Sequence, residues 1–250
     1  MDDRHLSAHR GPVGLPYGAE DITIDLRHGG ESAADKLLAV TRLRDPGLAD
    51  HAQRTAEIAV AIGEELGLDR ATLDHVYLGA QLHDIGKLGV AEAILWKPAG
   101  LTSTEWREVR THPEEGHRLV ADVVHRDVAS AVLYHHERMD GDGYPFGIDA
   151  RSLPITVRVV QVADAFDAMT SDRPYQRALP SGIAVDEIVR CAGSQFDPDV
   201  AEAAVRVFGD DRPPAIVEDE HAEEPTVKDQ EPDSDPFGTA GFLRLTDRPV

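Results

Sequence analysis

The sequence predicts an all-α fold, a helical bundle, on three observations. Apolar residues recur at helical spacing through most of residues 34–208. Residues that start or end helices punctuate this stretch, such as Pro113 at the first position of one segment and Gly67 after another. One short run, residues 22–26, alternates like a strand, but no second run is evident to pair with it, so a sheet is not expected.

The first helix is expected from Ala33 to Arg44, with Pro46 and Gly47 breaking the pattern. A second is expected over residues 50–66, with Asp50 as N-cap and Gly67 as C-cap. A third runs from Asp69 to about His83, and the period is interrupted after Asp84. Further helices are expected to start near residues 101–106 and at His112, and to cover residues 128–136, 154–169, 183–191 and 198–208.

Three regions follow from this pattern. Residues 1–33 are expected to be irregular, residues 34–208 form the helical domain, and residues 209–250 form an acidic disordered tail. The tail holds twelve Asp or Glu against four Lys or Arg. Its more apolar end, residues 237–245, leaves open a protein partner, although a solvated terminus is favoured.

Composition excludes several classes of function. The formal net charge of -21 argues against a nucleic-acid polymer as ligand, but not against a phosphate substrate, because bound metals invert the local charge. The single cysteine, Cys191, excludes an intrachain disulfide. No apolar run approaches the ~18–20 residues that span a bilayer, and the first residues do not resemble a signal peptide. A cytoplasmic protein without a membrane segment is expected.

The strongest chemical signal is the doublet His83-Asp84, around which residues that commonly bind metals recur: His51, His112, His135, His136 and Asp164. Imidazole and carboxylate without thiolate suit iron, manganese, zinc or cobalt. Two such ions a few ångströms apart can hydrolyse a phosphate ester. With two oxygens, Asp84 is the natural bridge, and Lys87, one turn after His83, is placed to contact a phosphate oxygen or the attacking hydroxide.

Each of these residues also has an ordinary structural interpretation. Taken alone, His51 is more often a surface or core-edge histidine, His112 the neighbour of a helix cap, and the His135-His136 pair a polar helix end. Asp164 is harder to explain in this way, because a carboxylate in an apolar run is costly to bury unless it is paired or bound to metal. Asp167 lies on the same helix face and is expected to support the site from behind a ligand.

The loop over residues 140–150 is rich in glycine. Gly141 and Gly143 permit positive φ, and the loop can present Tyr144 to a substrate; an ordinary turn is the alternative. The remaining histidines, among them His75 and His125, are interpreted as structural or solvated.

Together these motifs make the sequence resemble the HD-GYP branch of the HD-domain metal-dependent phosphohydrolases. The matching strings are HDIGK at 83–87, THPEEG at 111–116, HHERMDGDGYP at 135–145, VADAFDAMTSDRPY at 162–175 and QFDP at 195–198. The resemblance covers roughly residues 35–208 and implies an HD-type helical bundle with a buried di-metal site. It implies hydrolysis of cyclic di-GMP to linear pGpG, GMP or both, through attack of a metal-bound hydroxide.

The resemblance also implies roles for single residues. One metal would be held by His51, His83, Asp84 and Asp164, and the other by Asp84, His112, His135 and His136. Lys87 matches the phosphate- or hydroxide-contacting lysine, and Tyr144 and Arg173 match positions that grip the dinucleotide. The metals are expected to be iron or manganese.

Two departures from the family pattern bear on function. Gly47 stands where some members have a glutamate that recruits a third metal, so two metals are expected. Gln176 stands where many members have Lys or Arg, which keeps another cyclic dinucleotide or phosphoester open as substrate. A third hypothesis is a signalling adaptor that binds cyclic di-GMP or a partner protein through the loop of Tyr144. The intact ligand set favours the enzyme.

Overall fold

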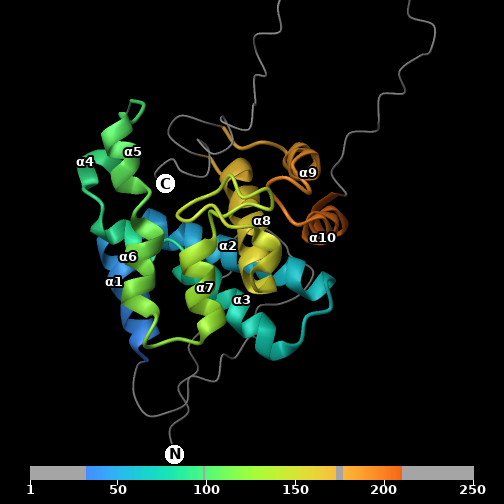
Figure 1. Ribbon diagram of the computed structural model, residues 1–250, viewed down its shortest axis with the longest axis horizontal. Helices are drawn as coiled ribbons and strands as arrows, with labels where there is room; N and C mark the ends of the chain where they lie inside the picture. Colours follow the sequence, from blue (N-terminus) through green and yellow to red (C-terminus); the bar gives the residue numbers. More distant parts are fainter. Residues whose placement is uncertain (1–31, 98, 173–176, 210–250) are drawn as a thin grey trace, which may run out of the picture. The chain divides into compact units, whose positions relative to one another are not determined.

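A computed structural model describes residues 32–97, 99–172 and 177–209 of the chain. Its helices are α1 Ala33–Arg44, α2 Pro46–Glu65, α3 Arg70–Leu82, α4 Glu92–Leu95, α5 Ser103–Val109, α6 His112–Val120, α7 Arg126–Tyr134, α8 Ile155–Thr170, α9 Ser181–Arg190 and α10 Pro198–Phe208 (Figure 1). Two 3-10 turns, η2 Ile85–Gly89 and η3 Ala150–Ser152, join them. The described residues form no strand, only two isolated β-bridges, so the all-α prediction is confirmed.

Helix α8 is the centre of the domain, and it packs against α2, α3, α7, α9 and α10. All of its residues from Thr156 to Met169 except Arg158 are buried. Its apolar side chains join the largest core cluster together with Ile62, Ile188 and Phe196. A burial this complete explains why any carboxylate on α8 needs a partner.

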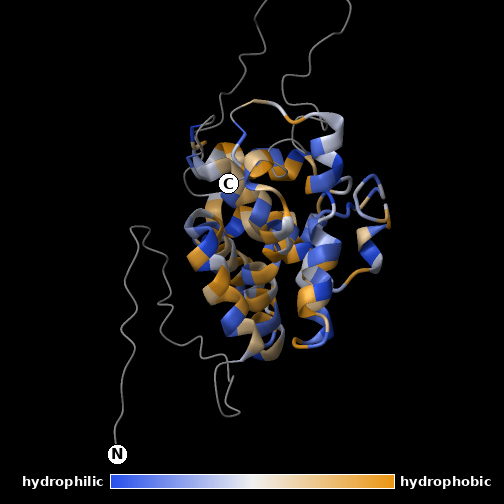
Figure 2. Cartoon of the chain, turned by 90° about the vertical axis from the view of Figure 1, so that its left-hand side faces the viewer, coloured by the Kyte–Doolittle hydropathy of each residue, from blue (hydrophilic) through white to orange (hydrophobic). Residues whose placement is uncertain are grey.

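A second apolar cluster lies where η2 and α6 meet α3 and α7. It contains Leu82, Ile85, Val120, Val128 and Val132, all buried. Hydrophobic and hydrophilic residues are interleaved along the helices, as amphipathic helices require (Figure 2). The two clusters hold α3 and α7 side by side, which aligns the ends of these helices.

The predicted start of α2 is wrong by four residues. The helix begins at Pro46, and the N-cap is Asp45 rather than Asp50: the Asp45 carboxylate accepts a hydrogen bond from the backbone N–H of Leu48 at 2.9 Å. Proline in the first turn needs no hydrogen-bond partner for its nitrogen, so it starts this helix instead of breaking it. The C-cap is Leu66 rather than Gly67, and Gly67 follows it in the left-handed region with φ of 70°.

The other predicted helices lie within a few residues of the observed ones, and α10 matches in full. No helix in the described ranges is long and apolar enough to cross a membrane. Several predictions fall outside the described residues: the strand-like run at 22–26, the roles of Arg173 and Gln176, and the tail from residue 210 onward.

Candidate metal centre

The His83-Asp84 doublet lies where α3 ends and η2 begins. His83 is the C-cap of α3, and the chain then turns tightly through η2. A Cβ on Gly86 would lie 2.0 Å from the carbonyl oxygen of His112 and 2.5 Å from the backbone nitrogen of Gly116. Only glycine permits this approach of backbone to backbone, and it brings the doublet beside the start of α6.

Three histidines of the candidate centre are held by the same kind of hydrogen bond, from the ring to a backbone carbonyl. The Nδ1 atoms of His83, His112 and His135 lie 2.6, 2.7 and 2.9 Å from the carbonyl oxygens of the third residue before each, Ala80, Val109 and Val132. These carbonyls belong to the last turns of α3, α5 and α7, where backbone oxygens have no partner within the helix. An Nδ1–H that donates there fixes the tautomer and leaves the Nε2 lone pair for a metal.

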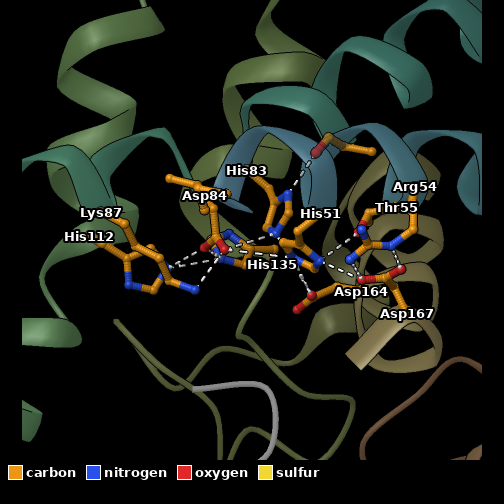
Figure 3. Close-up of polar contacts among 12 residues, drawn as sticks. His51, Arg54, Thr55, His83, Asp84, Lys87, His112, His135, Asp164 and Asp167 are labelled. Atoms are coloured by element: carbon orange, nitrogen blue, oxygen red, sulfur yellow. Dashed lines mark hydrogen bonds and ion pairs between the residues drawn. The ribbon is translucent and has the colours of Figure 1, made fainter. Parts of the chain in front are cut away.

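His51 on α2 is oriented by a carboxylate instead. Its Nδ1 lies 2.7 Å from Oδ2 of Asp167, and its Nε2 lies 3.2 Å from Oδ1 of Asp164. Arg54 holds Asp167 from the other side, with Nε 2.6 Å from Oδ1 (Figure 3). Asp164 and Asp167 are three residues apart on α8, so both face α2.

The gathered side chains form two groups of potential ligand atoms. One consists of Asp84, His112, His135 and His136, and the other of His51, His83 and Asp164; within each group the atoms lie within 4.8 Å of one another. All seven side chains are buried. The structure thus brings together every residue that the sequence predicted as a metal ligand, from α2, α3, α6, α8 and the end of α7.

Asp84 connects the two groups through its two oxygens. Oδ1 lies 3.2 Å from Nε2 of His112 and 3.7 Å from Nε2 of His135. Oδ2 lies 3.4 Å from Nε2 of His83 and 3.8 Å from Nε2 of His51. A carboxylate placed between two imidazole groups in this way has the geometry of a bridging ligand.

The donor atoms fit a pair of metal ions. His83 Nε2 and Asp84 Oδ1 are buried, yet neither makes a hydrogen bond within the described part of the chain. The Nε2 atoms of His112 and His135 face each other at 3.1 Å, although the Nδ1 of each ring is already held by a carbonyl. Buried polar atoms without partners are costly, and a cation among these nitrogens and oxygens would satisfy them.

The electrostatics divide the histidines into two kinds. Burial lowers the pKa of His51, but hydrogen bonds to Asp164 and Asp167 outweigh it and raise this pKa to about 9. Burial lowers the pKa of His135 to about 4, and burial together with His135 holds the pKa of His136 well below its usual value. At neutral pH His135 and His136 are therefore neutral, while His51 keeps a proton that a metal would displace.

Lys87 is buried at the edge of the same centre. Its Nζ lies 2.6 Å from Oδ2 of Asp84, the oxygen that faces His83 (Figure 3). Burial raises the pKa of Asp84, but the charges of Lys87 and His83 outweigh it and hold this pKa far below its ordinary value. The Asp84 carboxylate is therefore ionised, and the amino group of Lys87 lies next to it.

The loop after the His135-His136 pair is held in place by Glu137. Glu137 is buried, and its two oxygens accept hydrogen bonds from the backbone N–H groups of Phe146 and Ile148 at 2.8 and 2.9 Å. Gly141 has φ of 79°, as expected, whereas Gly143 is not among the glycines with positive φ. A Cβ on Gly143 would lie 2.5 Å from Cα of Glu137, so this glycine is required by close approach rather than by φ.

The loop places Tyr144 on the metal-ligand candidates. The Tyr144 ring stacks on His136, with centroids 4.6 Å apart and an interplanar angle of 18°. The guanidinium of Arg110, at the end of α5, lies 4.9 Å from the centroid of the Tyr144 ring. Beside this stack lies a small pocket of about 20 Å³, lined by His135, His136, Glu137, Arg138, Gln161, Asp164, Gln195 and Phe196.

Sequence reasoning missed three residues of this site. Arg54 has no local signal, because its partner Asp167 is distant in the chain. Glu137 lies inside the HHERMDGDGYP string, but its residue type alone does not mark it as the support of the following loop. Arg110 is an exposed arginine two residues before His112, and only the fold reveals that it covers Tyr144.

Comparison with known proteins identifies relatives of this chain. A family model described as HD domain matches residues 37–200. The chain is 34% identical over 174 residues to the cyclic di-GMP phosphodiesterase response regulator RpfG of Xanthomonas campestris, a match that covers 68% of this chain and 46% of that protein. It is 32% identical over 190 residues to 3'3'-cGAMP-specific phosphodiesterase 3 of Vibrio cholerae, covering 75% of this chain and 40% of that protein.

Among solved structures, Bd1817, described as an HDG"Y"P protein from Bdellovibrio bacteriovorus, aligns with a TM-score of 0.55 and 18% identity, over 70% of this chain and 60% of that one. At this identity the likeness shows the fold alone. The chain spans less than half the length of the two curated relatives.

Proposed function

Since the chain belongs to the HD domain family, we propose that it is a metal-dependent phosphodiesterase that opens cyclic di-GMP to linear pGpG, GMP or both. The observation that carries this proposal is the placement of Asp84, whose two oxygens face two separate groups of buried imidazoles. The curated relative RpfG is named a cyclic di-GMP phosphodiesterase, which supports this choice of substrate.

The two groups are proposed to hold two divalent ions, iron or manganese. His51, His83 and Asp164 would hold one, His112, His135 and His136 the other, and Asp84 would bridge them. When bound, such a pair supplies Lewis acidity for the phosphate and a water activated as nucleophile. Gly47 offers no side chain for a third ion, which supports a pair.

The residues around the ions are proposed to bind and orient the phosphodiester. Lys87, buried beside Asp84, would donate a hydrogen bond to a phosphate oxygen or hold the attacking water in line. The ring of Tyr144 is occupied by its stack on His136, so its hydroxyl is the group proposed to meet the substrate. Arg110, next to that ring, would add a positive charge for the dinucleotide phosphates. Arg173, outside the described residues, is proposed as a second such contact.

A second candidate substrate is 3'3'-cGAMP. It differs from cyclic di-GMP in one base, and a relative named for it is nearly as similar to this chain as RpfG. The centre, which would act on the phosphates, does not distinguish the two. The adaptor hypothesis remains as a third reading, in which the dinucleotide or a partner protein is bound but not hydrolysed.

The decisive experiment is turnover by protein purified without oxygen and supplied with iron or manganese. Cyclic di-GMP and 3'3'-cGAMP are offered separately, products are resolved by chromatography, and metal content is measured. We expect pGpG or GMP from the wild type and no product above background from Asp84→Ala. Turnover of 3'3'-cGAMP alone would change the substrate, and wild-type turnover by Asp84→Ala would refute the bridge. Protein without turnover and without stoichiometric metal would favour the adaptor.

A further inference from the structure

A second cluster of metal-binding side chains lies outside the candidate centre, between α3 and the start of α7. The rings of His75 and His125 stack with centroids 4.0 Å apart and an interplanar angle of 5°. Asp127 completes the group, and one potential ligand atom from each of the three residues lies within 4.8 Å of the others. His75 and Asp127 are half-buried and His125 is exposed, so the cluster is open to water on one side.

The contacts that these three side chains make with the protein are long. His125 is the N-cap of α7, but its Nδ1 accepts only a long bond, 3.3 Å, from the backbone N–H of Asp127. The Asp127 carboxylate lies 3.7 Å from that ring and 3.6 Å from Arg126, whose side chain is 89% exposed. These contacts are weak. Because the two rings lie nearly parallel, the exposed His125 ring would have to turn out of the stack before both imidazoles could bind one ion.

The residue types select the cation. Two imidazoles and one carboxylate, without thiolate, are a donor set that zinc accepts in four-coordinate sites, with water in the open position. Magnesium and calcium, which prefer oxygen ligands, do not fit this set.

We propose that His75, His125 and Asp127 form a surface zinc site that clamps α3 to the N-terminus of α7. This site is independent of the proposed phosphodiesterase activity. Its position has a mechanical consequence, because both helices end in residues of the candidate centre: α3 in His83 and α7 in His135. An ion at the cluster would therefore hold α3 and α7 together near the start of α7. The candidate centre would hold the same two helices together at their C-terminal ends.

The test uses folded protein already loaded with manganese. It is equilibrated with zinc, freed of excess metal by gel filtration, and analysed for both elements. Zinc also replaces manganese in the centre, so the quantity of interest is zinc gained minus manganese lost. The double variant His75→Gln with His125→Ser removes both imidazoles, and the new serine is itself a good N-cap, so α7 keeps its start. His117→Gln, on α6 and in neither metal-ligand group nor this cluster, is the matched control.

We expect the wild type and the His117→Gln control to exceed the double variant by one zinc per chain. Zinc should also raise the melting temperature of the wild type more than that of the double variant. Equal zinc uptake by the wild type and the double variant would overturn the proposal, whatever the catalytic activity. Should the double variant not fold, Asp127→Asn, which keeps the side-chain shape, gives the same comparison. Zinc uptake equal to that of the wild type, together with an equal zinc-induced rise in melting temperature, would count against the site.

Discussion

The Nδ1 of His51 lies 2.7 Å from Oδ2 of Asp167, on the opposite edge of the ring from the nitrogen that faces Asp164. Asp167 is itself held by Arg54 and by the hydroxyl of Ser171 at 3.0 Å. The carboxylate therefore fixes both the orientation and the tautomer of the histidine, which is the usual role of an acid behind a metal ligand.

Asp167→Asn should weaken metal binding or activity by roughly 10- to 100-fold, because His51 loses the negative charge that orients its ring. Manganese affinity and turnover of the metal-saturated enzyme are the two measurements. Asp74→Asn is the control, since Asp74 forms an ordinary ion pair with Arg70 at the surface. Equal manganese affinity for wild type and Asp167→Asn would show that this contact does not act through the metal.

Manganese affinity should rise with pH by about tenfold per unit between pH 6.5 and 8.5. The pKa of His51 is raised to about 9, so the metal-free site holds a proton there that binding must displace. The pKa values of His135 and His136 are lowered, so these rings add no proton in that range. The dissociation constant for manganese, measured at several pH values, tests this. A flat profile would mean that His51 is neutral before the metal binds.

Gly86→Ala should destabilise the domain by roughly 3 kcal/mol or more, because the new methyl group would meet the backbone carbonyl of His112. Backbone on both sides leaves little freedom to relax. Chemical denaturation measures the change. Gly89→Ala in the same 3-10 turn is the control, because a Cβ there meets no atom within 4 Å. Similar unfolding midpoints for the two variants would contradict the packing argument.

Arg110→Ala should raise the KM for cyclic di-GMP roughly tenfold, since one charge-assisted contact and the support of Tyr144 are lost together. Turnover of bis(p-nitrophenyl) phosphate, which has a single phosphate and therefore lacks the further phosphate proposed to meet Arg110, should change much less, and Arg110→Lys should restore part of the loss. Arg107→Ala is the control, because the only hydrogen bond of its side chain among the described residues goes to Thr104, one turn away. A uniform loss with both substrates would indicate damage to the centre instead.

The sequence predicts most of the fold because helices carry local signals. Periodicity and caps locate α10 in full and α3 and α8 to within one residue. The start of α2 is missed because Pro46 was interpreted as a breaker, although the same residue favours the first turn of a helix. The expected HD-GYP resemblance is confirmed by the HD domain match and by the cyclic di-GMP phosphodiesterase relatives.

Contacts between distant residues could not be predicted in the same way. The motif strings contain six of the seven ligand candidates, all except His51, and the structure brings the seven together, while their role in binding metal stays a prediction. The support behind His51 includes Arg54, which reaches Asp167 across the fold in a pairing that no spacing reveals. Glu137 acts locally instead, on backbone N–H groups of the loop that follows it, and these carry no signal in the residue types. The sequence favours a structural or solvated role for His75 and His125 for the same reason: fifty residues separate them, and only the packing of α3 on α7 brings their rings together.

The bond from each of His83, His112 and His135 to the carbonyl three residues before it has a consequence for insertions and deletions. One residue added to or removed from the last turn of α3, α5 or α7 would turn the following histidine by about 100° and detach its ring from the carbonyl. Length differences among family members should therefore gather in the connections between helices. The final turns of these three helices should keep their length even where their sequences differ.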